Sequence, residues 1–229
     1  MDVHKSSLLA VFDSKQRLEV PLFQRQYVWN EEQQWLPLWE DIERKFTEAL
    51  DDRKDAPNHF LGSMVLDQKQ TPTGHVVVRQ VIDGQQRLTT LQIFLSAYRD
   101  FCQEHSCTDI ANECEKFLFN TGMMSDPKVD TFKVWPTQLD RPQFVDVLTS
   151  GSRNEVIKGH PLKKKPYGFS SKVQTICLAI SAPSRSLVAA NDSLRSRIEL
   201  TTMWLTISLI LASSSWNFPL FIVVSSSRL

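Results

Sequence analysis

The residues from Asp83 to Arg87 hold the side chains best suited to chemistry on an anion. A β-rich run at 76–82 stops at Asp83 and Gly84, and helix-forming residues begin at Gln85. A strand, a glycine turn and a helix start place unpaired backbone N–H groups at the positive end of a helix dipole, where phosphate groups commonly bind. Gly84 permits a positive φ or a close approach of another backbone. The spacing therefore predicts an anion site at this junction.

Arg87 opposes the helix dipole, because a cation in the first helical turn lies next to its positive end. A phosphate would neutralise this charge, and a guanidinium group can contact phosphate through two parallel hydrogen bonds. Asp83 could hold a divalent metal ion or orient a water molecule, and Gln85 and Gln86 could bond phosphate, base or water. In the structural alternative, Asp83 caps the helix and Arg87 pairs with it. The spacing leaves both open, and the segment lacks the lysine of a Walker loop.

A second polar cluster, residues 24–27, lies between a strand-like segment and the start of a helix. Arg25 is a further ligand for phosphate or carboxylate, and Tyr27 or Trp29 could stack on a base. In the alternative, Phe23, Tyr27 and Trp29 belong to the core and Arg25 forms a buried ion pair. We favour the core for the aromatic side chains and leave the role of Arg25 open.

Two other groups of residues are expected to be structural. Cys102, Cys107 and Cys114, with His105 between them, match no ordinary zinc spacing. Cys102 and Cys114 also fall at apolar helical positions, so we expect buried thiols. The three lysines at 163–165 favour a solvated loop over a contact with the DNA backbone.

The elements that position these residues follow from hydrophobic periodicity. The pattern predicts strands at 18–22, 59–67, 75–83 and 131–135, and helices at 30–50, 85–104, 108–119 and 141–148. Asn30 would cap the first helix with Gln33 as its capping-box partner, and Pro37 would loosen the first turns of that helix. Pro21 confines its strand to a sheet edge or a strand end. The mixture of elements predicts an α/β (α+β) fold.

Composition limits the classes of protein to consider. The chain has 229 residues, and its 26 basic and 26 acidic residues give no net charge, so no global basic field favours nucleic acid or anionic membranes. Hydrophobic residues make up 41% of the chain, enough for a core, and four cysteines are too few for a disulfide scaffold. The polar first residues lack a secretory signal, so we expect a cytoplasmic protein.

Residues 170–229 differ in character from the rest of the chain. They are rich in serine, and no charged residue occurs from 200 to 227. Three interpretations compete: a membrane anchor, a buried segment, or aberrant, out-of-frame sequence. The apolar stretch is long enough to cross a bilayer, which requires roughly 20 residues, but its serines and Pro219 weaken the interpretation as a membrane anchor. We favour an aberrant or disordered tail after a basic linker at 151–169, because helix caps, periodicity and charge balance fade together.

Four segments together resemble the N-terminal domain of GmrSD-type restriction endonucleases. They are residues 20–29 (VPLFQRQYVW), 59–65 (HFLGSMV), 81–91 (VIDGQQRLTTL) and 136–144, with Asp140 and Arg141 in the last segment. The similarity covers residues 5–150. Four motifs in the right order make the resemblance specific.

The resemblance implies a ParB/sulfiredoxin-like fold, a small mixed sheet flanked by helices, that binds and hydrolyses ATP or GTP with Mg²⁺ or Mn²⁺. It implies catalytic roles for Asp83, Gln85, Gln86 and Arg87, with Asp83 also as the metal ligand. The residues it implies for nucleotide binding are Gln24, Arg25, Tyr27, Gly84, Arg87, Thr89 and Thr90. In such proteins this domain regulates or powers a nuclease that attacks modified phage DNA.

The chain also departs from the family pattern. Members usually continue into a helical region and a C-terminal His-Asn-His nuclease domain. None of the five histidines here forms such a pair: His4, His59, His75, His105 and His160. We therefore expect a truncated version without a nuclease domain, with modified DNA and a nuclease subunit supplied in trans as partners. The competing hypothesis is a non-catalytic nucleotide- or DNA-binding module, or an inactive remnant.

Overall fold

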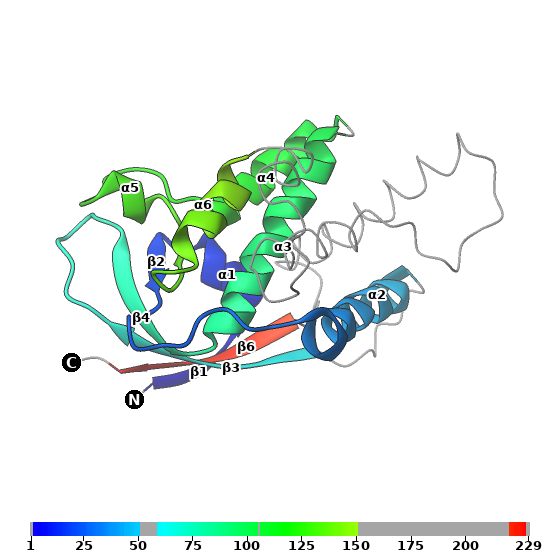
Figure 1. Cartoon of the computed structure of the whole chain (residues 1–229), viewed down its shortest axis with the longest axis horizontal. Coiled ribbons are helices and arrows are strands. Elements are labelled where there is room, and N and C mark those ends of the chain that lie inside the picture. Colours follow the sequence, from blue (N-terminus) through cyan, green and yellow to red (C-terminus); the bar gives the residue numbers. More distant parts are fainter. Residues whose placement is uncertain (1, 51–58, 105, 151–219, 228–229) are drawn as a thin grey trace.

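The computed structural model describes residues 2–50, 59–104, 106–150 and 220–227 (Figure 1). In chain order, the elements of these residues are β1 (Asp2–Ser7), α1 (Leu8–Asp13), β2 (Gln16–Glu19), the π-helix η1 (Glu31–Trp35), α2 (Leu36–Leu50), β3 (His59–Gln68), β4 (Val77–Asp83), α3 (Gln85–Glu104), α4 (Thr108–Leu118), α5 (Pro127–Asp130), β5 (Val134–Trp135), α6 (Arg141–Thr149) and β6 (Leu220–Ser227).

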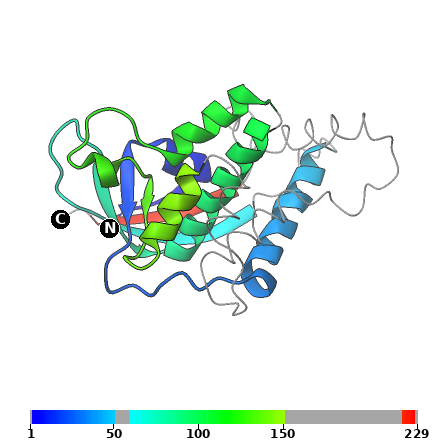
Figure 2. The ribbon, with the colours of Figure 1, turned by 45° about the horizontal axis from the view of Figure 1, so that its top comes forward.

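The strands form a mixed sheet in the order β1-β6-β3-β4-β2-β5. β6 is antiparallel to β1 and parallel to β3, and β3 is antiparallel to β4. β2 runs parallel to both of its neighbours, β4 and β5. Helices α3, α4 and α6 gather on one side of β3 and β6, and α2 lies apart from them near one end of β3 (Figures 1 and 2). The predicted α/β class, a small mixed sheet flanked by helices, is confirmed.

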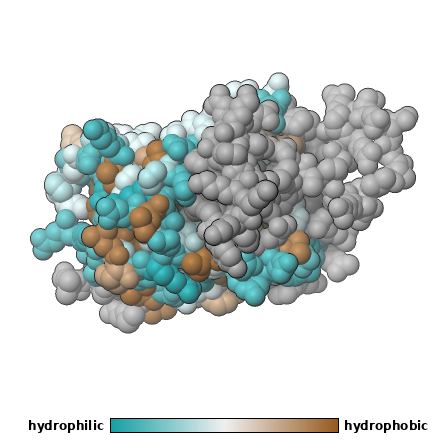
Figure 3. Space-filling view, viewed as in Figure 1, coloured by the Kyte–Doolittle hydropathy of each residue, from teal (hydrophilic) through white to brown (hydrophobic). Residues whose placement is uncertain are grey.

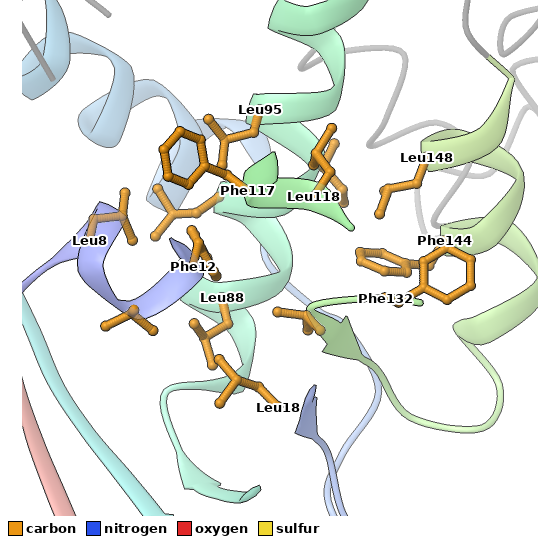
Figure 4. Close-up of a cluster of buried hydrophobic side chains, with 14 of the residues drawn as sticks. Leu8, Phe12, Leu18, Leu88, Leu95, Phe117, Leu118, Phe132, Phe144 and Leu148 are labelled. Atoms are coloured by element: carbon orange, nitrogen blue, oxygen red, sulfur yellow. The ribbon is translucent and has the colours of Figure 1, made fainter. Parts of the chain in front are cut away.

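An apolar core joins the helices to the sheet (Figure 4). Its buried side chains include Leu8 and Phe12 of α1, Leu88 and Leu95 of α3, Phe117 and Leu118 of α4, and Phe144 and Leu148 of α6. Each such side chain contributes roughly 1.5–3 kcal/mol when it is fully buried. The packing fixes the course of α3, and so the position of its first turn. On the visible surface of the described residues, apolar and polar groups are interspersed (Figure 3).

The predicted helix at 85–104 coincides with α3. The bounds predicted for the strands and helices around it differ from the observed bounds by only a few residues. The strand predicted at 18–22 is shifted: β2 spans Gln16–Glu19, and the Val20 N–H still donates to the Trp135 carbonyl at 2.8 Å. Pro21 follows and has no N–H to continue the ladder. The strand predicted from residue 75 begins at Val77.

The helix predicted at 30–50 begins as a π-helix before it continues as α2. The Asn30 side chain caps it as predicted, because Asn30 Oδ1 accepts from the Gln33 N–H at 3.0 Å. The return bond of the capping box comes from Gln34 instead of Gln33, since Gln34 Oε1 accepts from the Asn30 N–H at 2.9 Å. The wider π-turn, in which the Trp35 N–H donates to the Asn30 carbonyl, accounts for this shift by one residue. Pro37, which lacks an N–H, follows this turn.

The end of the tail has a defined place in the sheet. Residues Leu220–Ser227, for which we favoured aberrant or disordered sequence, form β6 between β1 and β3. The apolar run at 220–224 suits a strand with a neighbour on each side, because such strands read as continuous apolar runs. The basic linker at 151–169 and the tail residues 170–219 lie outside the described residues. Among the described helices, none is long and apolar enough to cross a membrane.

Two elements at the N-terminus, β1 and α1, were not predicted. α1 has only six residues, too few for a clear helical period, although the Ser7 side chain caps it by accepting from the Ala10 N–H at 3.1 Å. β1 acquires its neighbour from the far end of the chain. Neither feature is visible in a local sequence window.

Candidate functional site

The junction between β4 and α3 has the predicted form. β4 ends at Asp83, Gly84 has a φ of +100°, and α3 begins at Gln85. A Cβ atom at Gly84 would lie 3.1 Å from Met64 Cγ, so β3 packs closely over this turn. The first helical hydrogen bond runs from the Leu88 N–H to the Gly84 carbonyl. The N–H groups of residues 85–87 precede it and have no acceptor within the helix.

The Arg87 side chain lies against β3. Its Nη1 donates to the Leu61 carbonyl at 2.9 Å and its Nη2 to the Ser63 carbonyl at 2.6 Å. Between these two residues, Gly62 has a φ of +109°, and a Cβ atom there would lie 1.6 Å from Arg87 Nη1. The Asp83 carboxylate is farther away, 3.7 Å from Arg87 Nη2. The ion pair of the structural alternative is therefore present, but the two neutral carbonyl oxygens are the closer partners.

The two glutamines of the motif bind the main chain of residues 25–28. Gln85 Nε2 donates to the Arg25 carbonyl at 3.1 Å. Gln86 contacts this segment through both ends of its amide, since Nε2 donates to the Gln26 carbonyl at 3.0 Å and Oε1 accepts from the Val28 N–H at 2.8 Å. Both glutamine side chains are buried. In this structure they position the Arg25 segment at the start of α3, a role that the sequence reasoning did not anticipate.

Tyr27 and Thr90 belong to a buried chain of hydroxyl groups. Trp35 Nε1 donates to Tyr27 Oη at 2.8 Å, Tyr27 Oη lies 2.6 Å from Thr90 Oγ1, and Thr90 Oγ1 donates to the Gln86 carbonyl at 2.9 Å. The Tyr27 and Trp35 rings stack, and burial raises the pKa of Tyr27 well above its usual value. The core position favoured for Tyr27 is confirmed. Thr89 is buried as well.

The other aromatic side chains and Arg25 differ from Tyr27 in burial. Phe23 is 78% exposed, so the core position favoured for it is wrong, whereas Trp29 packs partly buried against the core. Arg25 is exposed, and its guanidinium group has no ion pair within the part of the chain that the structure describes. The buried ion pair considered for Arg25 is therefore wrong. Gln24 ties the segment to the end of β4, because its Nε2 donates to the Ile82 carbonyl at 3.0 Å.

Asp140, from the last of the four motifs, holds the first motif in place. Its Oδ2 accepts from the Tyr27 N–H at 2.9 Å and from Thr137 Oγ1 at 2.5 Å, and the residue is buried. Its position before Arg141 and Pro142, at the start of α6, was the available signal for such a role. The four motifs of the resemblance thus meet around the start of α3.

A pocket of about 260 Å³ opens beside Arg87, between the η1–α2 segment, β3 and α3. In its wall, His59 Nε2 lies 3.4 Å from Asp41 Oδ2. The residues that line it are Trp29, Gln33, Gln34, Leu38, Asp41, His59, Phe60, Leu61, Arg87 and Leu91.

Metal binding at Asp83 would depend on ligands from elsewhere. Among the described residues there is no group of three or more His, Cys, Asp or Glu side chains that could hold a metal ion. Mg²⁺ is commonly held by one or two carboxylates together with phosphate oxygens and water. The Asp83 side chain is 62% exposed at the start of a helix, which fits a shared site of that kind.

The cysteines around α3 and α4 are structural where the structure describes them. Cys102 and Cys114 are buried with Tyr98 and Ala111 in a small second core. Burial raises the pKa of Cys102 to about 11 and that of Cys114 to about 12, so both thiols stay protonated at neutral pH. The prediction of buried thiols is confirmed for these two residues. His105 lies outside the described residues.

Comparison with known families gives a match along most of the chain. Residues 8–223 match the family described as GmrSD restriction endonuclease, N-terminal domain. The match continues past residue 150 and reaches into β6. A search of curated proteins finds no match. The chain therefore belongs to the family of GmrSD restriction endonuclease N-terminal domains and is a component of a restriction system.

Proposed function

We propose that this domain binds and hydrolyses a nucleoside triphosphate, ATP or GTP, at the start of α3. The observation that carries the proposal is the meeting of the four family motifs around one helix N-terminus. Two arginines and one carboxylate, Arg25, Arg87 and Asp83, belong to this region. A helix N-terminus with cationic side chains nearby is suited to a polyanion.

The triphosphate would be bound by the free N–H groups of residues 85–87 and by Arg25. The Gln85 side chain holds the main chain of Arg25 at the helix start, while the Arg25 guanidinium extends into solvent. Ordering a guanidinium group on phosphate forms charge-assisted hydrogen bonds, which are stronger than those between neutral groups. Gln24, Tyr27 and Thr90 support this arrangement through the contacts that hold residues 24–28 on α3.

Arg87, whose side chain lies against β3, would also bind the phosphates. Its two closest acceptors are neutral carbonyl oxygens, and a phosphate oxygen is a stronger acceptor for a guanidinium group. A bound triphosphate would therefore compete with the carbonyl oxygens of Leu61 and Ser63 for the Arg87 guanidinium group. Asp83 would hold Mg²⁺ or Mn²⁺ together with phosphate oxygens, and the metal ion would supply charge neutralisation on the triphosphate. Gln85 and Gln86 act as positioning residues.

Within a restriction system, hydrolysis by this domain would regulate a nuclease that attacks modified phage DNA. The family supports this part of the proposal. In this proposal, modified DNA is the target, a nuclease supplied in trans is the partner, and the protein acts in the cytoplasm.

The proposal is tested by phosphate release from ATP and GTP, with Mg²⁺ or Mn²⁺, using the full chain, because β6 pairs with both β1 and β3. Arg25→Ala removes an exposed guanidinium without disturbing an ion pair in the described structure. We expect it to lower kcat/KM by about tenfold or more, since one arginine on a transferring phosphate can contribute far more than that. Lys128→Ala, which removes an exposed cation from α5, is the matched control.

Full activity in Arg25→Ala would contradict the proposed site. Saturable nucleotide binding without turnover, in a folded protein, would instead support the non-catalytic binding module. A protein that neither binds nor hydrolyses ATP or GTP would support the inactive remnant.

A further inference from the structure

We propose that the pocket beside Arg87 binds the nucleobase of the nucleoside triphosphate. This inference rests on the proposed function and adds the half of the site that recognises the base. The position of the pocket, its size and the polarity of the side chains in its wall support this inference.

The pocket adjoins the expected phosphate site through Arg87. The Arg87 side chain forms part of the pocket wall, and its Nη2 lies 3.7 Å from Asp83 Oδ2 at the end of β4. Leu91, one helical turn farther along α3, lines the same pocket. Phosphates at the first turn of α3 and a base in the pocket would thus lie on two sides of the same guanidinium group.

The size of the pocket suits one part of a nucleotide. Its volume is about 260 Å³, whereas pockets for whole ligands of drug size have about 300–1,000 Å³. Trp29, Leu38 and Leu61 give it apolar walls. A planar base can stack on an indole ring, and such stacking tolerates any of the bases because each has a π-face.

The glutamines of the wall present hydrogen-bond donors. The Asn30 N–H can only donate, so Gln34 must turn its Oε1 toward it, at 2.9 Å. The Gln33 N–H likewise fixes Asn30 Oδ1, which leaves Asn30 Nδ2 to donate to Gln33 Oε1 at 3.3 Å. Both amide oxygens are thus occupied, and each glutamine keeps its NH₂ group for a ligand. These groups match the ring nitrogens and carbonyl oxygens along the edge of a base.

Asp41 adds a carboxylate to a wall that also holds the Arg87 guanidinium group, so the two charges offset each other. One of its carboxylate oxygens pairs with Arg44 at 2.6 Å, and the other faces His59 Nε2 at 3.4 Å. A carboxylate in the wall repels an anion but accepts from the amino or ring N–H groups of a base. The combination of apolar walls, amide donors and one carboxylate fits a neutral, planar ligand with both donors and acceptors.

The experiment compares Leu38→Trp, which fills the pocket without removing a hydrogen bond, with Leu36→Trp. Leu36 is exposed on the same helix and does not line the pocket, so it is the matched control. KM is measured for ATP, GTP, CTP and UTP, and for inorganic tripolyphosphate, which has no base. We expect Leu38→Trp to raise KM for the hydrolysed nucleotides about tenfold and to leave KM for tripolyphosphate within about twofold. Leu36→Trp should change neither value.

A second variant, Gln33→Ala, removes one donor from an exposed position and should raise KM for the nucleotides in the same selective way. Equal KM values for every nucleotide in wild type and Leu38→Trp would overturn the base pocket while the proposed function stands. If the wild type hydrolyses nothing, the proposed function fails, and binding of free adenosine, guanosine, cytidine and uridine tests the pocket separately. Saturable nucleoside binding that Leu38→Trp weakens would support the pocket, and no binding by the wild type would overturn it.

Discussion

The two ends of α3 each carry an arginine, and their surroundings are opposite. Arg99, near the C-terminal end, is 2% exposed and donates from Nε and Nη2 to Asp100 Oδ1 at 2.9 and 2.7 Å. Its Nη1 also reaches the Leu148 carbonyl at 2.8 Å and Glu115 Oε1 at 3.2 Å. Arg87, in the first turn, has two carbonyl oxygens and a carboxylate at 3.7 Å. Arg99 is neutralised within the fold, whereas among the described residues the carboxylate that pairs with Arg87 lies 3.7 Å away.

This difference separates a structural arginine from one that a ligand can recruit. The charge of Arg99 is balanced by Asp100 and Glu115, and its contacts connect α3 to α4 and α6. An incoming anion would have to replace the buried Asp100 carboxylate and the partly exposed carboxylate of Glu115 there. At Arg87, which is partly exposed, the two closest acceptors are neutral carbonyl oxygens, and the Asp83 carboxylate lies 3.7 Å away. The start of α3 is therefore the end suited to ligand binding.

The largest effect is expected from Arg99→Ala. The variant leaves the buried Asp100 carboxylate without its partner, and breaking a buried pair in this way typically costs about 3–5 kcal/mol of unfolding free energy. Urea denaturation at neutral pH measures this loss. Burial already raises the pKa of Asp100, so protonation of this side chain should reduce the loss as the pH is lowered. A loss below about 1 kcal/mol would mean that Arg99 is no more structural than a surface arginine.

Gly62→Ala tests the contact between Arg87 and β3 at the other end of α3. The new Cβ atom would lie 1.6 Å from Arg87 Nη1, which forces the guanidinium from β3. The end of this flexible side chain can move away, so the cost comes from the loss of its hydrogen bonds to β3, roughly 1–3 kcal/mol, in addition to the strain of a positive φ. Gly74→Ala is the matched control, because Gly74 has a φ of +83° and nothing within 4 Å of its added Cβ.

Urea denaturation of both glycine variants isolates the clash with Arg87. We expect Gly62→Ala to be the less stable of the two, and Arg87→Ala to remove most of the extra cost when combined with it. Equal stability of the two glycine variants would show that the Arg87 contact with β3 contributes nothing.

A smaller effect is expected from Gln86→Ala, which removes both bonds to the main chain of residues 26–28. The loss should be about 1 kcal/mol of unfolding free energy, since Val28 is partly accessible to water. Hydrogen exchange of the Val28 amide should become faster, while amides in the middle of α3 keep their protection. An unchanged exchange rate at Val28 would exclude the positioning role of Gln86.

Ionisation of the buried thiols at the Arg99 end of α3 has no effect on stability at neutral pH and contributes a pH dependence only at high pH. The pKa values of Cys102 and Cys114, about 11 and about 12, lie above the usual 9.0 of the unfolded chain. The native state therefore retains protons that the unfolded state releases, and stability should be full below pH 9 and fall as the pH rises through these values. Urea midpoints at about pH 8 and pH 10.5 test this. Replacing both cysteines with alanine should flatten this part of the profile.

Local sequence patterns were sufficient for the elements nearest the site. α3, β3 and the turn at Gly84 were predicted because periodicity, β-rich runs and glycine act over a few neighbouring residues. The roles of Gln85, Gln86 and Arg87 were not, because their partners are main-chain groups. Every residue type carries such groups, so no pattern of side chains indicates them. Arg99 was missed for a related reason, since its burial depends on α4 and α6.

The α/β class, the helix that begins at Gln85 and the family were all evident from the sequence, because they follow from local propensity and from four motifs in order. Which side chains remain accessible depends on the tertiary packing. Arg25 and Phe23 are exposed, Tyr27 is buried, and Arg87 turns to β3. It also placed β6 between β1 and β3. These outcomes depend on contacts between residues far apart in the chain, and burial and pairing arise only when such segments meet.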